Sequence, residues 1–463
     1  MFVPTKLWSL TATEVLSLIK RDLITVEDYA SALLDRIESR NSIVKAWQYF
    51  DSDLVLSQAR ALDQVPHDQR GRLHGVAIAI KDIMTPKVAR YCLLDQDMQT
   101  KYGSPLYKGN RPNADASIVE IVRSSGALIV GKTTTTEFTV LNSGPDTTNP
   151  HDPNRTPGGS SARSAAAVAD FQVPLSFGTQ TGGSVICPAS YTGTYAMKPT
   201  FDTISGGGIK VASHELDTIG YFARSMDDLE LIFTNVLSVT VEEAHEEVPL
   251  KEDTVGFLKS PFWPSAGPGT IAAMENAAEI LRSHGVTVVD VEFPDEFNDV
   301  RTLNRMFEVI FVTNGGVSFY KDYLMDTTKT KLDPDVRAFV EDAPKFSREE
   351  VRQAFDYFAA LRPVFDKIAI QYSALITPSA TDEAPLGLGD MGSPVFNSVW
   401  TAAHMPVIHV PAFAGPNGMP VGVSLISRRY SDQYLLRIAK ILSGPLVSEG
   451  NWQQRLAAEI GIR

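Results

Sequence analysis

Apolar residues recur at steps of three and four positions in two stretches near the start of the chain. Residues 9–22 (SLTATEVLSLIKRD) and 25–41 (TVEDYASALLDRIESRN) carry this spacing, and each opens with a serine or a threonine. The spacing is that of one face of an α-helix, and hydroxyl side chains commonly cap a first helical turn. The pattern therefore predicts an N-terminal helical segment over residues 1–65.

Beyond this segment, short apolar runs alternate with helical spacing. Residues 75–83 (GVAIAIKDI) and 127–133 (ALIVGKT) are continuous apolar runs next to glycine, which is typical of buried strands. Residues 115–126 and the alanine-rich residues 161–171 have helical spacing. Further strands are expected at 253–260, 286–293, 373–380 and 419–427. This alternation predicts an α/β fold built on a parallel or mixed β-sheet.

Residues 295–372 differ from the rest of the chain. They are more polar, and residues 347–373 have the strongest helical spacing of the whole sequence. No linker, low-complexity tract or internal repeat divides the chain. We therefore expect a single domain over residues 1–463, with residues 295–372 as a helical cap or insertion.

The charge of the chain restricts its partners. The 463 residues have a net charge of −13 and no cluster of Lys and Arg, so we expect no direct nucleic-acid ligand. Only two cysteines occur, Cys92 and Cys187, which favours a reducing compartment over a disulfide framework. The start of the chain lacks the pattern of a secretory signal, and no apolar run reaches the about 18 residues of a membrane span. We expect a cytoplasmic protein without membrane contact; assembly into a homodimer stays open.

Residues 126–133 (GALIVGKT) match the pattern of a nucleotide-binding phosphate loop. Such a loop needs a strand before its first glycine and a helix after its lysine. Here a predicted helix precedes Gly126, and the residues between the glycines form the predicted strand. Nucleotide binding through Lys132 is therefore a weak alternative.

Two loops rich in glycine and serine, GGSS (158–161) and TGGS (181–184), flank an alanine-rich helix. Consecutive glycines leave backbone N–H groups bare, as an oxyanion hole for acyl transfer requires. A serine at the end of such a turn can act as a nucleophile. An ordinary structural turn is the alternative for an isolated GGS.

A serine nucleophile needs a base. His404 and His409 are the most plausible of the eight histidines, but neither belongs to a recognisable triad pattern. Lys81 ends the apolar run GVAIAI, and burial lowers the pKa of a lysine, so that a neutral amine can accept a proton. A solvent-exposed lysine at the end of a strand is the ordinary alternative.

Several blocks, taken together and in order, resemble the amidase signature family. They are GVAIAIKD, GKTTTTEF, NPHDPNRTPGGSS, GTQTGGSVICPAS, GTYAMKPT, ITPSATDEAP and MPVIHVPAFAGPNGMPVGVSLIS. The resemblance spans roughly residues 5–440. It implies a large, mixed, twisted β-sheet covered on both faces by helices, and a Ser–cis-Ser–Lys triad.

The resemblance also implies roles for individual residues. Ser184 matches the nucleophile, Ser160 the bridging serine with a cis peptide bond, and Lys81 the base. Ser161 matches a serine that orients the lysine. The backbone of the oxyanion hole is implied for Thr181, Gly182, Gly183 and Ser184. No metal or other cofactor is implied, and no His, Asp and Glu cluster has the spacing of metal ligands.

The chain departs from the family pattern at several points. Ala162 and Arg163 replace the usual glycines after GGSS. Gln180 matches malonamidase-like members, but Cys187 stands where these commonly have an arginine that can bind a substrate carboxylate. Residues 85–102 are longer than the family pattern, which leaves open a loop near the active site or an error in the gene sequence. Residues expected near the substrate are Gln180, Cys187, Tyr191 and Trp400.

The sequence thus predicts an amidase that cleaves the C–N bond of a small, neutral, linear amide through an acyl-enzyme. The alternative is the glutamine-hydrolysing subunit of a tRNA-dependent amidotransferase. Subunits of that type usually carry GTDTGGSIR, from which Gln180 and Cys187 depart.

Overall fold

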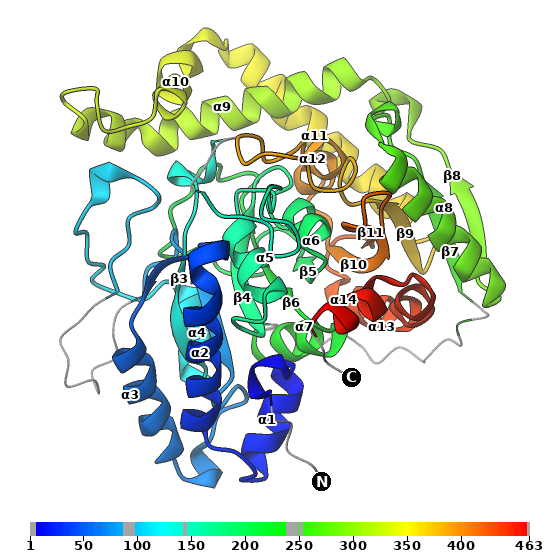
Figure 1. The fold of residues 1–463 in the computed structure, drawn as a ribbon. Helices are drawn as coiled ribbons and strands as arrows, with labels where there is room; N and C mark the ends of the chain where they lie inside the picture. Colours follow the sequence, from blue (N-terminus) through cyan, green and yellow to red (C-terminus); the bar gives the residue numbers. More distant parts are fainter. Residues whose placement is uncertain (1–5, 87–97, 142–145, 238–249, 251–252, 461–463) are drawn as a thin grey trace.

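A single mixed β-sheet forms the centre of the protein in a computed structural model that describes residues 6–86, 98–141, 146–237, 250 and 253–460 (Figure 1). Its strands are β1 Trp47–Phe50, β2 Ala77–Lys81, β3 Leu128–Thr133, β4 Leu175–Gln180, β5 Tyr195–Lys198, β6 Thr218–Ala223, β7 Thr254–Leu258, β8 Thr287–Val291, β9 Ala374–Pro378, β10 Val407–Ala414 and β11 Pro420–Ile426. Their order in the sheet is β1-β3-β2-β4-β6-β5-β10-β11-β9-β7-β8.

The sheet is parallel at two places and antiparallel between them. Strand β2 runs parallel to both of its neighbours, β3 and β4, and the far edge is formed by the parallel strands β9, β7 and β8. The strands between these groups pair antiparallel, and so do β1 and β3. This arrangement confirms the expected α/β fold with a mixed sheet.

Helices cover both faces of the sheet. They are α1 Ala12–Lys20, α2 Val26–Val44, α3 Ser52–Asp63, α4 Ser117–Ser124, α5 Ala162–Ala169, α6 Ile186–Thr192, α7 Met226–Ile232, α8 Pro268–Ser283, α9 Val300–Met325, α10 Pro334–Asp342, α11 Arg348–Ala369, α12 Val395–Ala402, α13 Asp432–Glu449 and α14 Trp452–Ile460. Alternate residues of β2 enter different hydrophobic clusters. Ala77 and Ala79 pack with residues of α2 and α5, whereas Ile78 and Ile80 pack with residues of α4 and α7. Burial on both faces explains why β2 reads as a continuous apolar run.

The N-terminal segment is not wholly helical. Helices α1, α2 and α3 form where the spacing predicts them, and threonine capping boxes begin α1 and α2. Between α2 and α3, however, the residues of β1 pair antiparallel with β3. The helical interpretation of residues 1–65 was therefore wrong for Trp47–Phe50, whose side chains are only half-buried at the edge of the sheet. The sequence of β1, WQYF, does not alternate strictly between apolar and polar residues, so the pattern gave no strand signal.

The segment 295–372 is largely helical, as expected. Helices α9, α10 and α11 lie together along one side of the molecule, at the top in Figure 1. Asp299 caps α9, and a Ser347–Glu350 capping box begins α11. Phe311 of α9 and Phe339 of α10 stack edge-to-face, with 4.9 Å between their ring centres. This ring contact joins α9 to α10, and an ion pair between Arg305 and Glu350 joins α9 to α11.

Candidate active site

Lys81 ends β2 and is completely buried. Its Nζ atom lies 2.8 Å from Ser160 Oγ, 2.9 Å from Ser161 Oγ and 3.1 Å from Thr179 Oγ1. Because β2 and β4 are parallel neighbours, Lys81 and the end of β4 meet at the same edge of the sheet. The structure thus brings Lys81, Ser160 and Ser161 together, as the resemblance implied.

The hydroxyl of Ser161 determines how Lys81 donates. It donates its only proton to the carbonyl of Thr179 at 3.0 Å and accepts the N–H of Thr179 at 3.1 Å. It can therefore only accept from Lys81. A neutral amine has two N–H groups and one lone pair, so one of the two other hydroxyls, Ser160 or Thr179, must face the lone pair.

The surroundings of Lys81 favour the neutral amine. Burial lowers the pKa of Lys81 well below its ordinary value, and the nearby guanidinium of Arg163 lowers it further. The carboxylate of Asp217 acts in the opposite direction. Asp82, the next residue in the chain, binds Lys132 at 2.7 Å. This contact agrees with the strand alternation, which directs Asp82 to the face opposite Lys81.

The two glycine-serine loops contact each other. Ser161 donates its backbone N–H to the carbonyl of Ser184 at 3.3 Å, and the peptide bond between Gly159 and Ser160 is cis. Ser184 is half-buried, and its hydroxyl forms no hydrogen bond within the part of the chain that the structure describes. A short rearrangement or a bound substrate is needed to join it to Ser160, which is common in free enzymes.

The side chain of Gln180, which the sequence analysis placed near the substrate, instead forms hydrogen bonds within the protein. Its side-chain carbonyl accepts the N–H groups of Val185 at 2.9 Å and Ile186 at 3.0 Å, and its amide donates to Thr401. This buried side chain therefore fixes the start of α6.

By contrast, the backbone N–H groups of the preceding loop residues, Gly182, Gly183 and Ser184, make no hydrogen bond to a described residue. Backbone donors without a protein partner are what an oxyanion hole requires. Thr181 anchors the loop through its hydroxyl, which donates to Asp217 at 2.6 Å.

The other residues expected near the substrate separate into two groups. Cys187 and Tyr191 lie on α6 in a small buried cluster with Ala380, Ala384 and Met419. Trp400 is completely buried in the main core, where its ring lies 5.1 Å from that of Phe365. The structure thus places Trp400 in the core, not at a substrate-contacting surface.

Met391 and Pro394, which follow β9, cover the two glycine-serine loops. A β-carbon on Gly159 would lie 1.7 Å from the sulfur of Met391, so the thioether occupies the space above this glycine. Pro394 lies at 3.0 Å from the corresponding position of Gly183. The side chains of Met391 and Pro394 are both uncharged.

The two histidines considered as bases are engaged elsewhere. His404 Nε2 lies 2.8 Å from the carbonyl of Glu215, and its ring stacks on Phe201. His409 Nδ1 lies 2.8 Å from Ser379 Oγ. Burial lowers the pKa of each histidine to about 3. Neither forms a hydrogen bond with a glycine-serine loop in the described residues, which leaves Lys81 as the candidate base.

Residues 126–133 do not form a phosphate loop. Helix α4 ends at Ser124, and β3 occupies residues 128–133, as the sequence predicted. Lys132 is completely buried, where it pairs with Asp82 and donates to Thr100. A buried ion pair of this kind leaves the lysine unavailable to a nucleotide.

Sequence reasoning missed Thr179 and Asp217. Thr179 adjoins Gln180 in β4, so strand alternation alone could have placed its side chain on the face of the sheet opposite that of Gln180. Asp217 precedes β6, and the sequence carried no signal for its contact with Thr181.

Two classes of feature are absent from the described residues. Among residues 6–86, 98–141, 146–237 and 253–460, no three His, Cys, Asp or Glu side chains gather as metal ligands. Within the same residues, no helix has the length and apolar character needed to cross a bilayer. Most of the expected long segment 85–102, including Cys92, lies outside the described residues.

Known proteins resemble this chain in sequence. The sequence pattern of the family described as Amidase matches residues 28–436. The chain is 28% identical to the A subunit of the glutamyl-tRNA(Gln) amidotransferase of Chloroflexus aurantiacus, over 94% of this chain and 96% of that protein. It is 40% identical to the protein of the same name from Acidothermus cellulolyticus, over 61% of this chain and 58% of that protein.

Solved structures share the fold. The peptide amidase of Stenotrophomonas maltophilia has a TM-score of 0.77 and 24% identity, covering 94% of this chain and 96% of that one. A fatty acid amide hydrolase has a TM-score of 0.84 and 20% identity, covering 96% and 87%. At these identities the likeness shows the fold alone.

Proposed function

Because the chain belongs to the amidase family, we propose that it hydrolyses the C–N bond of a small, neutral, linear amide to a carboxylic acid and ammonia or an amine. The observation that carries this proposal is the buried Lys81, held by three hydroxyls beside the two glycine-serine loops.

In the proposed mechanism, Lys81 is the base and Ser160 the proton relay. The lone pair of neutral Lys81 takes the hydroxyl proton of Ser160, while Ser160 takes the proton of Ser184. The Ser184 oxygen attacks the amide carbonyl, and the backbone N–H groups of Gly182, Gly183 and Ser184 stabilise the oxyanion. Ser161 and Thr179 accept the N–H groups of Lys81.

The tetrahedral intermediate then collapses. The C–N bond breaks, and the proton held by Lys81 passes through Ser160 to the leaving nitrogen. This leaves an ester between the acyl group and Ser184. A water molecule attacks the ester by the same relay, which releases the acid and restores the Ser184 hydroxyl.

The preference for a neutral substrate is supported by the residues around the loops. Met391 and Pro394 carry no charge. Burial raises the pKa of the Cys187 thiol to about 12, so Cys187 is also uncharged at neutral pH. Since none of these can pair with a carboxylate, an acidic substrate of the malonate type is disfavoured.

A second candidate is glutamine hydrolysis as one component of a tRNA-dependent amidotransferase. Its support is the likeness along the whole chain to proteins named as the A subunit of such an enzyme. Purification of the tagged chain from its own cells discriminates between the two, because only this second function requires stable partner proteins. Glutaminase activity that appears only with those partners would replace the first proposal by the second.

The test of the first proposal is turnover of a panel of aliphatic, aromatic and ureido amides by the purified chain. Ammonia release from at least one neutral amide, lost in Ser184→Ala, is expected. A Ser184→Ala variant that folds and retains activity would overturn the assignment of the nucleophile.

A further inference from the structure

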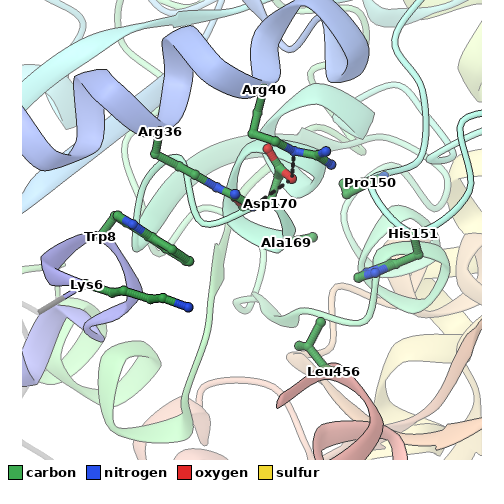
Figure 2. A pocket seen from close by; sticks show the side chains of 9 residues that line it. All are labelled: Lys6, Trp8, Arg36, Arg40, Pro150, His151, Ala169, Asp170 and Leu456. Atoms are coloured by element: carbon green, nitrogen blue, oxygen red, sulfur yellow. Dashed lines mark hydrogen bonds and ion pairs between the residues drawn. The ribbon is translucent and has the colours of Figure 1, made fainter. Parts of the chain in front are cut away.

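A cavity of about 470 Å³ lies at the end of α5 that is opposite the candidate active site. Helix α5 begins directly after Ser161 and ends beside Asp170. Figure 2 shows the side chains of Arg36 and Arg40, from α2, converging on Asp170 beside this cavity. The cavity is large enough for a small organic molecule.

The carboxylate of Asp170 forms ion pairs with the guanidinium groups of both Arg36 and Arg40. Asp170 Oδ1 lies 3.1 Å from Arg36 Nη2 and 2.9 Å from Arg40 Nε. The other carboxylate oxygen accepts the side-chain amide of Gln172 at 2.8 Å. The backbone carbonyl of Asp170 accepts Arg36 Nε at 2.8 Å. Asp170 is 2% exposed and Gln172 is fully buried, so the partners that hold the two arginines are themselves fixed in position.

The cavity carries an excess of positive charge. Lys6, Arg36 and Arg40 line it, and Asp170 is the single carboxylate among its described lining residues. This excess of two positive charges is unusual in a chain whose net charge is −13. Burial has the largest effect on the pKa of Arg36 and lowers it; the charge of Asp170 raises this pKa, and repulsion from the charge of Arg40 lowers it. An anion between the two groups would relieve this repulsion.

The arginines also retain unused donors. In the part of the chain that the structure describes, the Nη groups of Arg40 and the Nη1 group of Arg36 form no hydrogen bond. A planar guanidinium with free N–H groups matches the geometry of a carboxylate or phosphate. Trp8, whose ring lies 4.7 Å from the guanidinium of Arg36, and Leu456 add an apolar wall.

We propose that this cavity binds the oxyanion group of a small molecule, a phosphate or a carboxylate. Arg36 and Arg40 supply the charge and the N–H donors, and Lys6 adds a third cation. Trp8 and Leu456 contact the apolar part of the ligand. This site is separate from the proposed catalytic residues and does not depend on the proposed activity.

Calorimetric titration of the full chain at pH 7 and about 0.1 M salt tests the proposal, with inorganic phosphate and benzoate as probes. Saturable binding of at least one probe is expected, together with a change in Trp8 fluorescence that Trp8→Phe removes. The affinity should fall at least tenfold in Arg40→Gln. Arg40→Lys, which keeps the charge but not the planar fork, should lose less.

The matched control is Arg60→Gln. Arg60 forms an exposed ion pair with Glu27 outside the cavity, so its removal should leave the affinity unchanged. Binding of phosphate alone assigns a phosphate ligand, and binding of benzoate alone assigns a carboxylate. Absence of saturable binding of both probes, or equal affinity in Arg40→Gln and the wild type, would overturn the proposal. If Arg40→Gln fails to fold, Lys6→Gln replaces it, and a smaller loss of affinity is expected because Lys6 supplies only the third positive charge.

Discussion

The hydroxyl of Ser161 binds both the backbone of β4 and the candidate base Lys81, so its removal should change both stability and activity. The pairing of β2 with β4 ends at Ala79 and Ser176. Beyond these residues, the hydroxyl of Ser161 makes the hydrogen bonds to the β4 backbone that a neighbouring strand would otherwise make. Its Oγ atom bonds both backbone groups of Thr179 and one N–H of Lys81. Ser161→Ala therefore leaves three buried groups without a partner.

The expected loss of stability follows from this count. A buried polar group without a partner costs about 1–3 kcal/mol. At the lower end of this range, three groups give a loss of about 3 kcal/mol in the free energy of unfolding. The loss is measured as the shift of the urea unfolding curve of Ser161→Ala relative to the wild type.

The same substitution should alter the pH dependence of activity. An oxygen that accepts from Lys81 stabilises the ammonium more than the neutral amine, so its removal lowers the pKa of Lys81 further. The acid limb of kcat/KM should move to lower pH. We also expect the pH-independent value to fall at least about tenfold, since one misplaced hydrogen bond of 1.4 kcal/mol suffices for this factor.

Thr179→Val is the matched control for Ser161→Ala. It removes one contact of Lys81 at 3.1 Å but keeps the shape of the side chain and both backbone bonds to Ser161. The acid limb should shift in the same direction, with a stability loss of about 1 kcal/mol. Equal stability losses in both variants, or an unchanged acid limb in both, would refute the role given to Ser161.

Three further outcomes are expected. In the wild type, kcat/KM should fall as the pH drops through the lowered pKa of Lys81, because the ammonium cannot accept a proton. The activity of Lys81→Met should be about 10²–10⁴-fold lower, and its pH profile should lack this acid limb. A fluorophosphonate probe should label Ser184 and not Cys187, whose thiol is protonated at neutral pH because burial raises its pKa to about 12; mass spectrometry of the labelled peptide decides. Lys132→Met should lower the free energy of unfolding by about 3–5 kcal/mol, because Asp82 is left as an unpaired buried carboxylate, and the wild type should show no ATP binding by calorimetry.

Much of the fold was readable from local patterns. The apolar runs of β2 and β3 indicate strands buried on both faces, and the spacing in α9 and α11 indicates amphipathic helices. The short strand β1 was not predicted, because its four half-buried residues show no clear period. Local patterns succeed where an element is a continuous apolar run or is long enough to repeat its own period.

The sequence by itself also determined the chemical groups of the candidate site: two glycine-serine loops and a lysine at the end of a buried strand. It did not determine which side chains surround that lysine. Thr179 and Asp217 reach the site because β2, β4 and β6 lie side by side in the sheet, and Gln180 turns away to hold α6. Strand alternation assigns a side chain to a face, but its partners on that face come from strands distant in sequence. Only the tertiary structure therefore decided the hydrogen bonds that orient Lys81.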